Sequence, residues 1–322
     1  MKPSTVLVTG ASGYLGSLLV AALAAEDAVQ HRVIAADWRE TPPQDRRQGV
    51  EYLTADVRSP GLIQLFDQRQ VEVVVHLASI VTPGRASNRE FEYSVDVKGT
   101  ENVLLACHAC GVKKIIVSSS GAAYGYHADN PMPLTEDCPL RGNEAFAYSQ
   151  HKRLVEEMLA KWRDAHPELE QVIFRIGTIL GKTVRNQITD YFEKPRLLAI
   201  RGSDSPFVFI WDQDVVACLK RAIETEGGGI YNLAGDGVLS IHEIAARLGK
   251  PCLELPPGLL RFALSVLKPL GLTQYGPEQL DFLRYRPVLD NTRLKTEFGY
   301  VPQMTSAQVF ELYRAARQTH GT

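Results

Sequence analysis

The first half of the chain alternates short hydrophobic, β-branched runs with longer segments in which apolar residues recur at helical spacing. The short runs predict buried strands at 5–8, 32–36, 73–76, 114–118 and 171–175, and the periodic segments predict helices at 15–25, 62–69, 91–110 and 146–163. Strands that alternate with helices favour a parallel sheet covered on both faces. We therefore expect an α/β fold of the Rossmann type, with a doubly wound parallel sheet.

The rhythm changes after about residue 180, where prolines and glycines separate shorter segments. We expect one domain at 1–180 and a smaller C-terminal α/β lobe at 181–322. The boundary is soft because no linker or repeat separates the two parts, so some later segments are expected to return to the first domain. The apolar helix at 259–267 is expected to pack within the lobe. The alternative is that it lines a pocket for an apolar substrate.

Three glycines, Gly10, Gly13 and Gly16, connect the first predicted strand to the first predicted helix. Glycines at this spacing allow a tight turn and let a pyrophosphate approach backbone N–H groups at a helix N-terminus. The strand–turn–helix context raises the pattern above a chance match. The glycine pattern predicts a dinucleotide-binding site in the first domain. Substrate binding is then expected mainly in the C-terminal lobe. An ordinary strand-to-helix turn is the alternative.

Asp37 ends the second predicted strand, about twenty residues after the last of these glycines. A carboxylate at this place accepts hydrogen bonds from the adenosine ribose hydroxyls and repels a 2′-phosphate. NAD is therefore favoured as the cofactor and NADP is less favoured, although Arg39 is close enough to soften the preference. Without the glycines, Asp37 would be interpreted as a solvated loop acid.

Tyr148 and Lys152 are four residues apart in a predicted helix, so both project from one face. An unperturbed tyrosine has a pKa of about 10, but a lysine ammonium and an oxidised nicotinamide both stabilise its phenolate. Such a tyrosine can exchange a proton with a substrate alcohol or carbonyl. A serine-rich segment at 118–125 ends the strand that begins at residue 114, at the carboxyl edge where open α/β sheets place their chemistry.

Together these motifs resemble the extended short-chain dehydrogenase/reductase superfamily, and within it the NAD-dependent epimerase/dehydratase family. The resemblance covers nearly the whole chain. It also includes Asp56-Val57, His76-Leu77-Ala78, Gly99-Thr100 and the segment from Arg175 to Gly181.

The resemblance implies a role for each matching residue. Tyr148 is the catalytic acid/base, Lys152 lowers its pKa and binds the nicotinamide ribose, and Ser120 hydrogen-bonds the reacting oxygen. The implied cofactor-binding residues are Gly10, Ser12, Gly13, Tyr14, Leu15, Gly16, Asp37, Asp56, Val57, Leu77, Ala78, Ser118, Tyr148, Lys152 and Ile176. A homodimer formed through the helices at 91–110 and 146–163 is also implied.

The chain departs from the family pattern at two places near the expected chemistry. Family members often have an asparagine where this chain has Asp96, which weakens any claim for an asparagine-based proton relay. Sugar-nucleotide dehydratases place an Asp-Glu pair directly after the catalytic hydroxyl residue, where this chain has Gly121 and Ala122. Dehydration is therefore not expected.

A third departure concerns the substrate. Many nucleotide-sugar enzymes of the family carry an arginine just before the strand that corresponds to 207–210. This chain has Ser205-Pro206 there, and Arg201 is offset. A nucleotide-sugar substrate is therefore less secure, without being excluded.

The charge pattern, the N-terminal sequence and the cysteines limit the kinds of binding partner and the cellular compartment that we expect. The chain has 35 basic and 37 acidic side chains and no long run of either sign, so no nucleic-acid or membrane partner is expected. The apolar run begins almost at the N-terminus, which leaves no room for a signal peptide and favours a cytoplasmic protein. Cys107 and Cys110 lie near the end of a predicted helix without further ligands, so we expect structural thiols and no metal.

The leading functional expectation is an NAD-dependent oxidoreductase that moves a hydride between nicotinamide and a secondary alcohol or ketone of a small-molecule substrate. NAD must then exchange in each cycle. The alternative is a nucleotide-sugar epimerase, an isomerase in which tightly bound NAD takes and returns the hydride. A third alternative, a noncatalytic NAD-binding sensor, has no need of Ser120, Tyr148 and Lys152 together.

Overall fold

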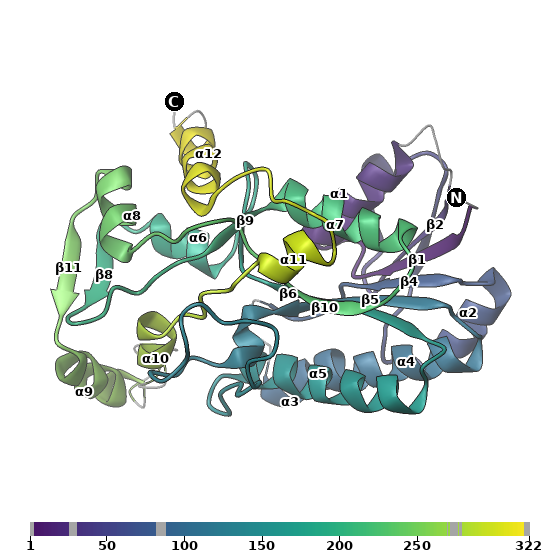
Figure 1. Cartoon of the computed structure of the whole chain (residues 1–322), viewed down its shortest axis with the longest axis horizontal. Helices are drawn as coiled ribbons and strands as arrows, with labels where there is room; N and C mark the ends of the chain where they lie inside the picture. The colour runs from purple at the N-terminus through teal and green to yellow at the C-terminus, as the bar shows by residue number, and fades with distance from the viewer. Residues whose placement is uncertain are drawn as a thin grey trace. The chain divides into compact units, whose positions relative to one another are not determined.

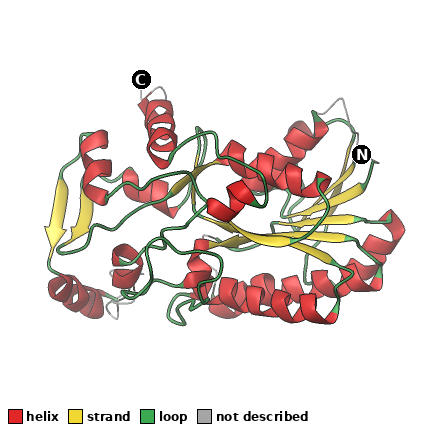
Figure 2. Cartoon of the chain, in the orientation of Figure 1, coloured by secondary structure: helices red, strands yellow, loops and turns green. Residues whose placement is uncertain are grey.

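A computed structural model of the chain describes residues 3–25, 31–81, 88–268, 270, 276 and 279–318. The chain divides into two compact units, and each unit combines several stretches of sequence. The first unit comprises Met1–Ser120, His151–Arg175 and Asp212–Tyr231, and the second comprises Gly121–Gln150, Ile176–Trp211 and Asn232–Thr322. Figures 1 and 2 show the helices and strands of both units.

The first unit is built on a seven-stranded sheet in the order β10-β6-β5-β4-β1-β2-β3. Its strands are β1 (Thr5–Thr9), β2 (Arg32–Asp37), β3 (Val50–Thr54), β4 (Val73–His76), β5 (Lys114–Ser120), β6 (Glu170–Ile176) and β10 (Gly229–Leu233). β1 pairs in parallel with β2 and with β4, and β4 pairs in parallel with β5. The strand order reverses at β1, as in doubly wound folds. The predicted α/β fold is confirmed.

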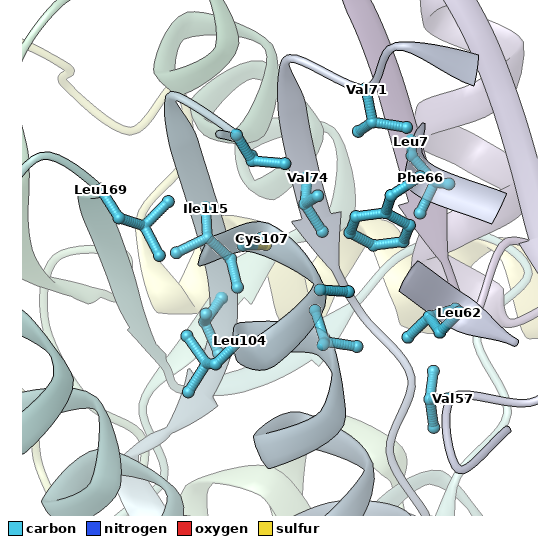
Figure 3. Close-up of a cluster of buried hydrophobic side chains, with 14 of the residues drawn as sticks. Leu7, Val57, Leu62, Phe66, Val71, Val74, Leu104, Cys107, Ile115 and Leu169 are labelled. Carbon is cyan, nitrogen blue, oxygen red and sulfur yellow. The ribbon is translucent and has the colours of Figure 1, made fainter. Parts of the chain in front are cut away.

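Helices cover both faces of this sheet. α2 (Leu62–Arg69), α4 (Gly99–Ala109) and the part of α5 (Ala147–Ala165) that belongs to the first unit lie on one face, and α1 (Tyr14–Ala24) and α7 (Asp212–Glu224) lie on the other (Figure 1). The side chains of Leu7, Val74 and Ile115 from the sheet pack with Phe66 and Leu104 from the helices (Figure 3).

The two neighbouring cysteines differ in their surroundings. Cys107 belongs to this core and is fully buried (Figure 3). Burial raises the pKa of its thiol, so the thiolate is disfavoured and the structural role predicted for Cys107 is confirmed. Cys110 is only partly buried, and its thiol donates to the carbonyl of Ile63 at 3.4 Å.

The predicted helix at 91–110 is interrupted. The structure has α3 (Arg89–Tyr93), a π-helical segment η2 (Ser94–Lys98) and then α4. The hydroxyls of Ser94 and Thr100 donate to backbone carbonyls of the preceding turns, at 2.7 Å to Phe91 and 2.6 Å to Asp96. Such bonds compete with the regular helical ladder. The wider turn carries Asp96, whose side chain is buried.

The second unit contains two short parallel strand pairs with helices around them. β7 (Thr178–Leu180) pairs with β9 (Phe209–Trp211), and β8 (Leu197–Ile200) pairs with β11 (Cys252–Leu255). Its other elements are η3 (Gly121–Tyr124), α6 (Gln187–Phe192), α8 (Ile241–Leu248), α9 (Pro257–Leu267), α10 (Gln279–Arg284), α11 (Thr292–Thr296) and α12 (Ser306–Gln318). A cluster of aromatic rings forms its core, including Phe192, Phe207, Phe209 and Phe310.

The expectation that the apolar helix α9 packs within the lobe is wrong. No residue of α9 is buried, and Leu259 and Phe262 are 55% and 67% exposed. Helical apolar spacing identifies a face that favours a nonpolar neighbour, but it does not show that the chain supplies one.

Among the residues that the structure describes, no helix has the length and hydropathy needed to cross a membrane.

A buried ion pair joins β6 to α5, and it provides a test of the first unit's packing. The Nη2 atom of Arg175 lies 2.7 Å from Oε2 of Glu156, and both side chains are almost fully buried. Replacing Glu156 with Gln leaves the arginine charge without its counter-charge, so we expect the free energy of unfolding to fall by about 3 kcal/mol. Denaturant unfolding monitored by circular dichroism measures this change.

Glu157→Gln is the matched control. It removes the solvent-exposed pair with Arg153 on the same helix, and we expect a loss of about 0.5 kcal/mol or less. Equal losses for the two variants would contradict the importance of the buried pair.

Candidate active site

The turn between β1 and α1 brings backbone segments too close together for side chains. Gly10 has φ +69°, and a Cβ atom on it would lie 2.7 Å from the backbone nitrogen of Ala78. A Cβ atom on Gly16 would lie 2.2 Å from the carbonyl oxygen of Gly10. The N–H of Gly13 donates to the same carbonyl at 3.0 Å and closes the turn. These positions need glycine, and the turn leads directly into the N-terminus of α1.

Asp37 connects this turn to the end of β2. Its carboxylate is 5% exposed and accepts hydrogen bonds from the backbone N–H groups of Ser12 and Arg39, each at 3.0 Å. The Nε atom of Arg39 lies 3.6 Å away. Each carboxylate oxygen has a second acceptor site, so Asp37 is able to accept further hydrogen bonds from a hydroxyl-bearing ligand.

Asp56 and Val57 follow β3 and have different surroundings. The Asp56 carboxylate pairs with Arg58 at 2.6 Å, and this hydrogen bond lowers the pKa of the Asp56 carboxyl. Val57 is buried, and its methyl group would lie 2.6 Å from a Cβ atom placed on Gly99. The close packing at Gly99 explains how the start of α4 approaches this loop.

A chain of hydrogen bonds determines which ring nitrogen of His76, at the end of β4, carries the proton. The hydroxyl of Thr100 donates to the Asp96 carbonyl, so its oxygen accepts from Nε2–H of His76 at 3.0 Å. Nδ1 of His76 then accepts from the hydroxyl of Thr9 at 2.7 Å. Burial, assisted by the Lys152 charge, lowers the pKa of His76 to about 3. The imidazole is therefore neutral.

Lys152 contacts the carboxyl end of β5 from inside the first unit. Its Nζ atom donates to the carbonyl of Ser118 at 2.8 Å. Burial lowers the pKa of Lys152, and the nearby carboxylates of Asp96 and Glu156 oppose this shift. Ser119, the next residue of the strand, donates to Glu156.

The first turn of α5 belongs to the second unit and carries Tyr148. The neighbouring Ser149 is fully buried, and its hydroxyl donates to the carbonyl of Ala122 at 2.6 Å. It also accepts from the backbone N–H of Asn143 at 3.0 Å. These bonds join the first turn of α5 to the segment that follows β5.

The predicted cofactor residues of the first unit, and the predicted catalytic residue Ser120, lie at the carboxyl ends of its strands. Ser12, Tyr14 and Leu15 accompany the glycines after β1, Asp37 ends β2, Asp56 and Val57 follow β3, Leu77 and Ala78 follow β4, and Ser118 and Ser120 end β5. Tyr148 and Ile176 belong to the second unit. The convergence of Ser120, Tyr148 and Lys152 stays a prediction.

The sequence analysis did not identify Arg286, which lies in the second unit. Its guanidinium lies over the rings of Phe207 and Phe282, at 4.0 and 4.4 Å from their centroids. Among the described residues, its Nε and Nη2 atoms have no hydrogen-bond partner. Burial lowers the pKa of Arg286 to about 10, so it stays charged at neutral pH. Arg286 lies in the segment Arg284-Tyr285-Arg286-Pro287, which matches no motif used in the sequence analysis and therefore gave no signal.

One group of described side chains has the atom types and spacing of metal ligands. Nδ1 atoms of His108 and His166 lie 3.5 and 3.4 Å from Oε1 of Glu168. The three residues lie at the C-terminal ends of α4 and α5, whereas Thr100 and Lys152 lie near the opposite ends of these helices. This group therefore does not belong to the candidate active site.

Known proteins are similar to nearly the whole length of this chain. The model of the NAD dependent epimerase/dehydratase family matches residues 6–234. The chain is 29% identical over 321 residues to the uncharacterized protein Rv0501 of Mycobacterium tuberculosis, with 98% of this chain and 84% of that protein covered. It is 28% identical over 336 residues to a UDP-glucose 4-epimerase of Mycolicibacterium smegmatis, with 94% and 95% covered.

Solved structures share the fold at lower identity. The Bordetella bronchiseptica enzyme WbmG, in complex with NAD and UDP, has a TM-score of 0.75 at 20% identity, with 99% of this chain and 96% of that chain covered. The UDP-glucose 4-epimerase of Thermotoga maritima, with UDP-glucose, has a TM-score of 0.75 at 17% identity, with 99% and 100% covered.

The neutral His76 generates a prediction about acid stability. Between pH 6.5 and about 3, the unfolded chain binds a proton at His76 that the folded chain does not bind. Stability therefore falls as the pH falls through this range, by about 1.4 kcal/mol per pH unit from this group. We expect His76→Asn to make the acid dependence of the unfolding free energy less steep by this amount.

Urea unfolding at a series of pH values measures the slope. His242→Asn is the control for the loss of one histidine, because this side chain is 44% exposed, and the slope of the His76 variant should be less steep than the slope of this control. An identical slope for the His76 variant and the parent protein would show that His76 is not held neutral.

Proposed function

The chain belongs to the NAD dependent epimerase/dehydratase family, and from this membership we propose that it transfers a hydride between NAD and a secondary alcohol or ketone. The family membership confirms the predicted cofactor. The glycine turn fits that cofactor, because its backbone leaves no space for side chains at Gly10 and Gly16 beside the N-terminus of α1. When bound, NAD supplies the hydride acceptor or donor.

One observation carries the catalytic part of the proposal: two hydrogen bonds from α5 flank Ser120 along the chain. Lys152 donates to the carbonyl of Ser118, and Ser149 donates to the carbonyl of Ala122. Tyr148 lies on the same helix, one turn before Lys152. This arrangement supports a site in which Ser120, Tyr148 and Lys152 act together.

The proposed roles follow from the chemistry of each side chain. Ser120 donates a hydrogen bond to the reacting oxygen of the substrate and holds it in place. Tyr148 Oη takes the proton of the alcohol during oxidation and returns a proton to the carbonyl oxygen during reduction. The Lys152 ammonium lowers the free energy of the tyrosinate and so lowers the pKa of Tyr148.

The proposed contacts with NAD use the remaining residues of the first unit. Asp37 accepts hydrogen bonds from the adenosine ribose hydroxyls, and its charge disfavours the 2′-phosphate of NADP. Asp56 and Val57 would contact the adenine, and Ala78 would belong to the loop that contacts the cofactor. Arg58 already engages the Asp56 carboxylate, so contacts from that residue must use its remaining acceptor sites.

A nucleotide-sugar epimerase is the second candidate, and Arg286 favours it. A buried guanidinium whose donors Nε and Nη2 have no partner among the described residues is suited to an anionic group such as a phosphate. The family's usual arginine before 207–210 is replaced by Ser205-Pro206, and Arg286 offers a different cation. The M. smegmatis relative and the T. maritima enzyme are both UDP-glucose 4-epimerases, which adds support for a substrate of this class.

Tyr148→Phe tests the catalytic proposal. We expect turnover of the best substrate in a panel of UDP-sugars to fall by about a hundredfold or more, because the proton donor and acceptor is lost. The dissociation constant of NAD, measured by calorimetry, should stay within about twofold of the parent value. Tyr52→Phe is the control, since its hydroxyl accepts a hydrogen bond from the backbone N–H of Arg47 and has no role in the proposed chemistry. Undiminished turnover in the Tyr148 variant would rule out the mechanism.

Cofactor retention separates the two candidates. An epimerase returns the hydride to its substrate and regenerates NAD in every cycle, so tight retention of NAD is expected. An oxidoreductase must release the cofactor after each turnover. Dinucleotide absorbance after extensive dialysis of the purified protein decides between them, because retained NAD supports the epimerase and complete loss supports the oxidoreductase.

A further inference from the structure

Asp96, which stands where the family often has asparagine, is a buried junction of three hydrogen bonds. Its carboxylate is 3% exposed. Oδ1 accepts from the backbone N–H of Ile80 at 2.8 Å and from the hydroxyl of Ser79 at 3.0 Å. Oδ2 lies 3.0 Å from Nδ1 of His151. Both oxygens are therefore used, one by the loop that follows β4 and the other by α5.

His151 depends on this contact for its hydrogen bonding. The side chain is 1% exposed, and its ring forms a T-shaped pair with the ring of Tyr93, with the centroids 5.7 Å apart. Among the residues that the structure describes, its Nε2 atom has no hydrogen-bond partner. A carboxylate can only accept hydrogen bonds, so Nδ1 carries the proton that is shared with Asp96.

The same loop is fixed independently at its other end. The backbone N–H of Ala78 donates to the hydroxyl oxygen of Thr9 at 3.4 Å, and Thr9 bonds the neutral His76. The hydrogen-bond chain continues from His76 through Thr100 to the backbone carbonyl of Asp96. The loop from Leu77 to Ile80 is thus attached to β1 at one end and to α5 at the other, and Asp96 takes part in both attachments.

We propose that Asp96 and His151 are positioning residues of the NAD site. Asp96 holds the loop from Leu77 to Ile80, and His151 ties that carboxylate to α5 at the residue directly before Lys152. The pair fixes the distance between two parts of the protein that contact NAD, the loop at Ala78 and the ammonium of Lys152. This inference rests on the proposed function, which places Ala78 at NAD, and on the nicotinamide-ribose contact that the family resemblance implies for Lys152.

The carboxylate of Asp96 has a second acceptor oxygen and a negative charge, both of which an asparagine lacks. An amide has one acceptor atom, so an asparagine that served Ile80 and Ser79 would turn its NH₂ group towards His151. Nδ1 would then have to accept, and the imidazole proton would move to Nε2, which has no described partner. The negative charge of Asp96 also opposes the effect of burial on the pKa of Lys152. Asp96 and His151 therefore act as a matched pair.

Two substitutions of His151 in the full chain separate positioning from general stability. His151→Leu removes the donor, and we expect the dissociation constant of NAD to rise about tenfold, the effect of losing a buried hydrogen bond to a charged group. His151→Asn places an amide N–H₂ near the Nδ1 position and should restore binding to within about threefold of the parent value. Titration calorimetry measures both constants, and thermal unfolding is recorded alongside.

Lys114→Met is the matched stability control. Lys114 is a buried cation of the same unit that lies 3.1 Å from Glu170, at the amino end of β5 and away from Ser118. This variant should lose thermal stability and keep the NAD affinity of the parent protein. A loss of affinity equal to that of His151→Leu would show that any destabilisation weakens NAD binding, and would overturn the proposal.

Asp96→Asn keeps the size of the side chain, and it tests the proposal by a second measurement if His151→Leu does not fold. In the parent protein we expect a low-field imidazole proton resonance from Nδ1–H of His151, and in Asp96→Asn we expect it to disappear because the amide must donate. Its absence from the parent protein would overturn the pairing, and so would unchanged NAD affinity in His151→Leu. NAD affinity is read without turnover, so failure of the Tyr148 mechanism stays distinguishable.

Discussion

The close approach between the β1–α1 turn and the loop after β4 is the constraint on which the site depends. A side chain on Gly10 would meet the backbone of Ala78, so two strand ends of the sheet lie in direct backbone contact. Parallel pairing of β1 with β4 brings these ends together, and the hydroxyl of Thr9 then reaches both Ala78 and His76. The same backbone that forms the fold therefore places this turn directly before the N-terminus of α1, where an anionic ligand is favoured.

Buried polar groups behind this edge keep the loops in place without exposing charge. His76 is neutral and satisfied on both nitrogens by threonine hydroxyls, which suits a group inside a hydrophobic sheet. Asp96 is a buried carboxylate. It lies 3.0 Å from His151, and its charge acts on Lys152. Glu156 and Arg175 form a buried ion pair one helical turn further along α5. Each pair joins α5 to a different strand or loop of the first unit.

Much of the first unit could be predicted, because long apolar strands and periodic helices leave strong patterns. β4 and α2 have the predicted bounds, and β1, β2, β5 and β6 are longer than predicted by one or two residues. β3 was not predicted, because its residues are only partly buried and Glu51 interrupts its apolar pattern. The π-helical turn at Asp96 is accompanied by side chain–backbone hydrogen bonds that hydrophobic spacing does not encode. Arg286 and the exposed face of α9 depend on tertiary surroundings, which no local pattern contains.

The central claim is that the glycine turn holds NAD through its backbone, and the NAD affinity of Gly10→Ala tests it most directly. An alanine at this position would hold a strained left-handed backbone conformation, and its methyl group would collide with the backbone of Ala78. We therefore predict that the dissociation constant of NAD rises about tenfold or more. Gly258→Ala, where a Cβ atom would meet nothing within 4 Å, should leave NAD binding unchanged. Equal and unaltered affinities in both folded variants would contradict the account.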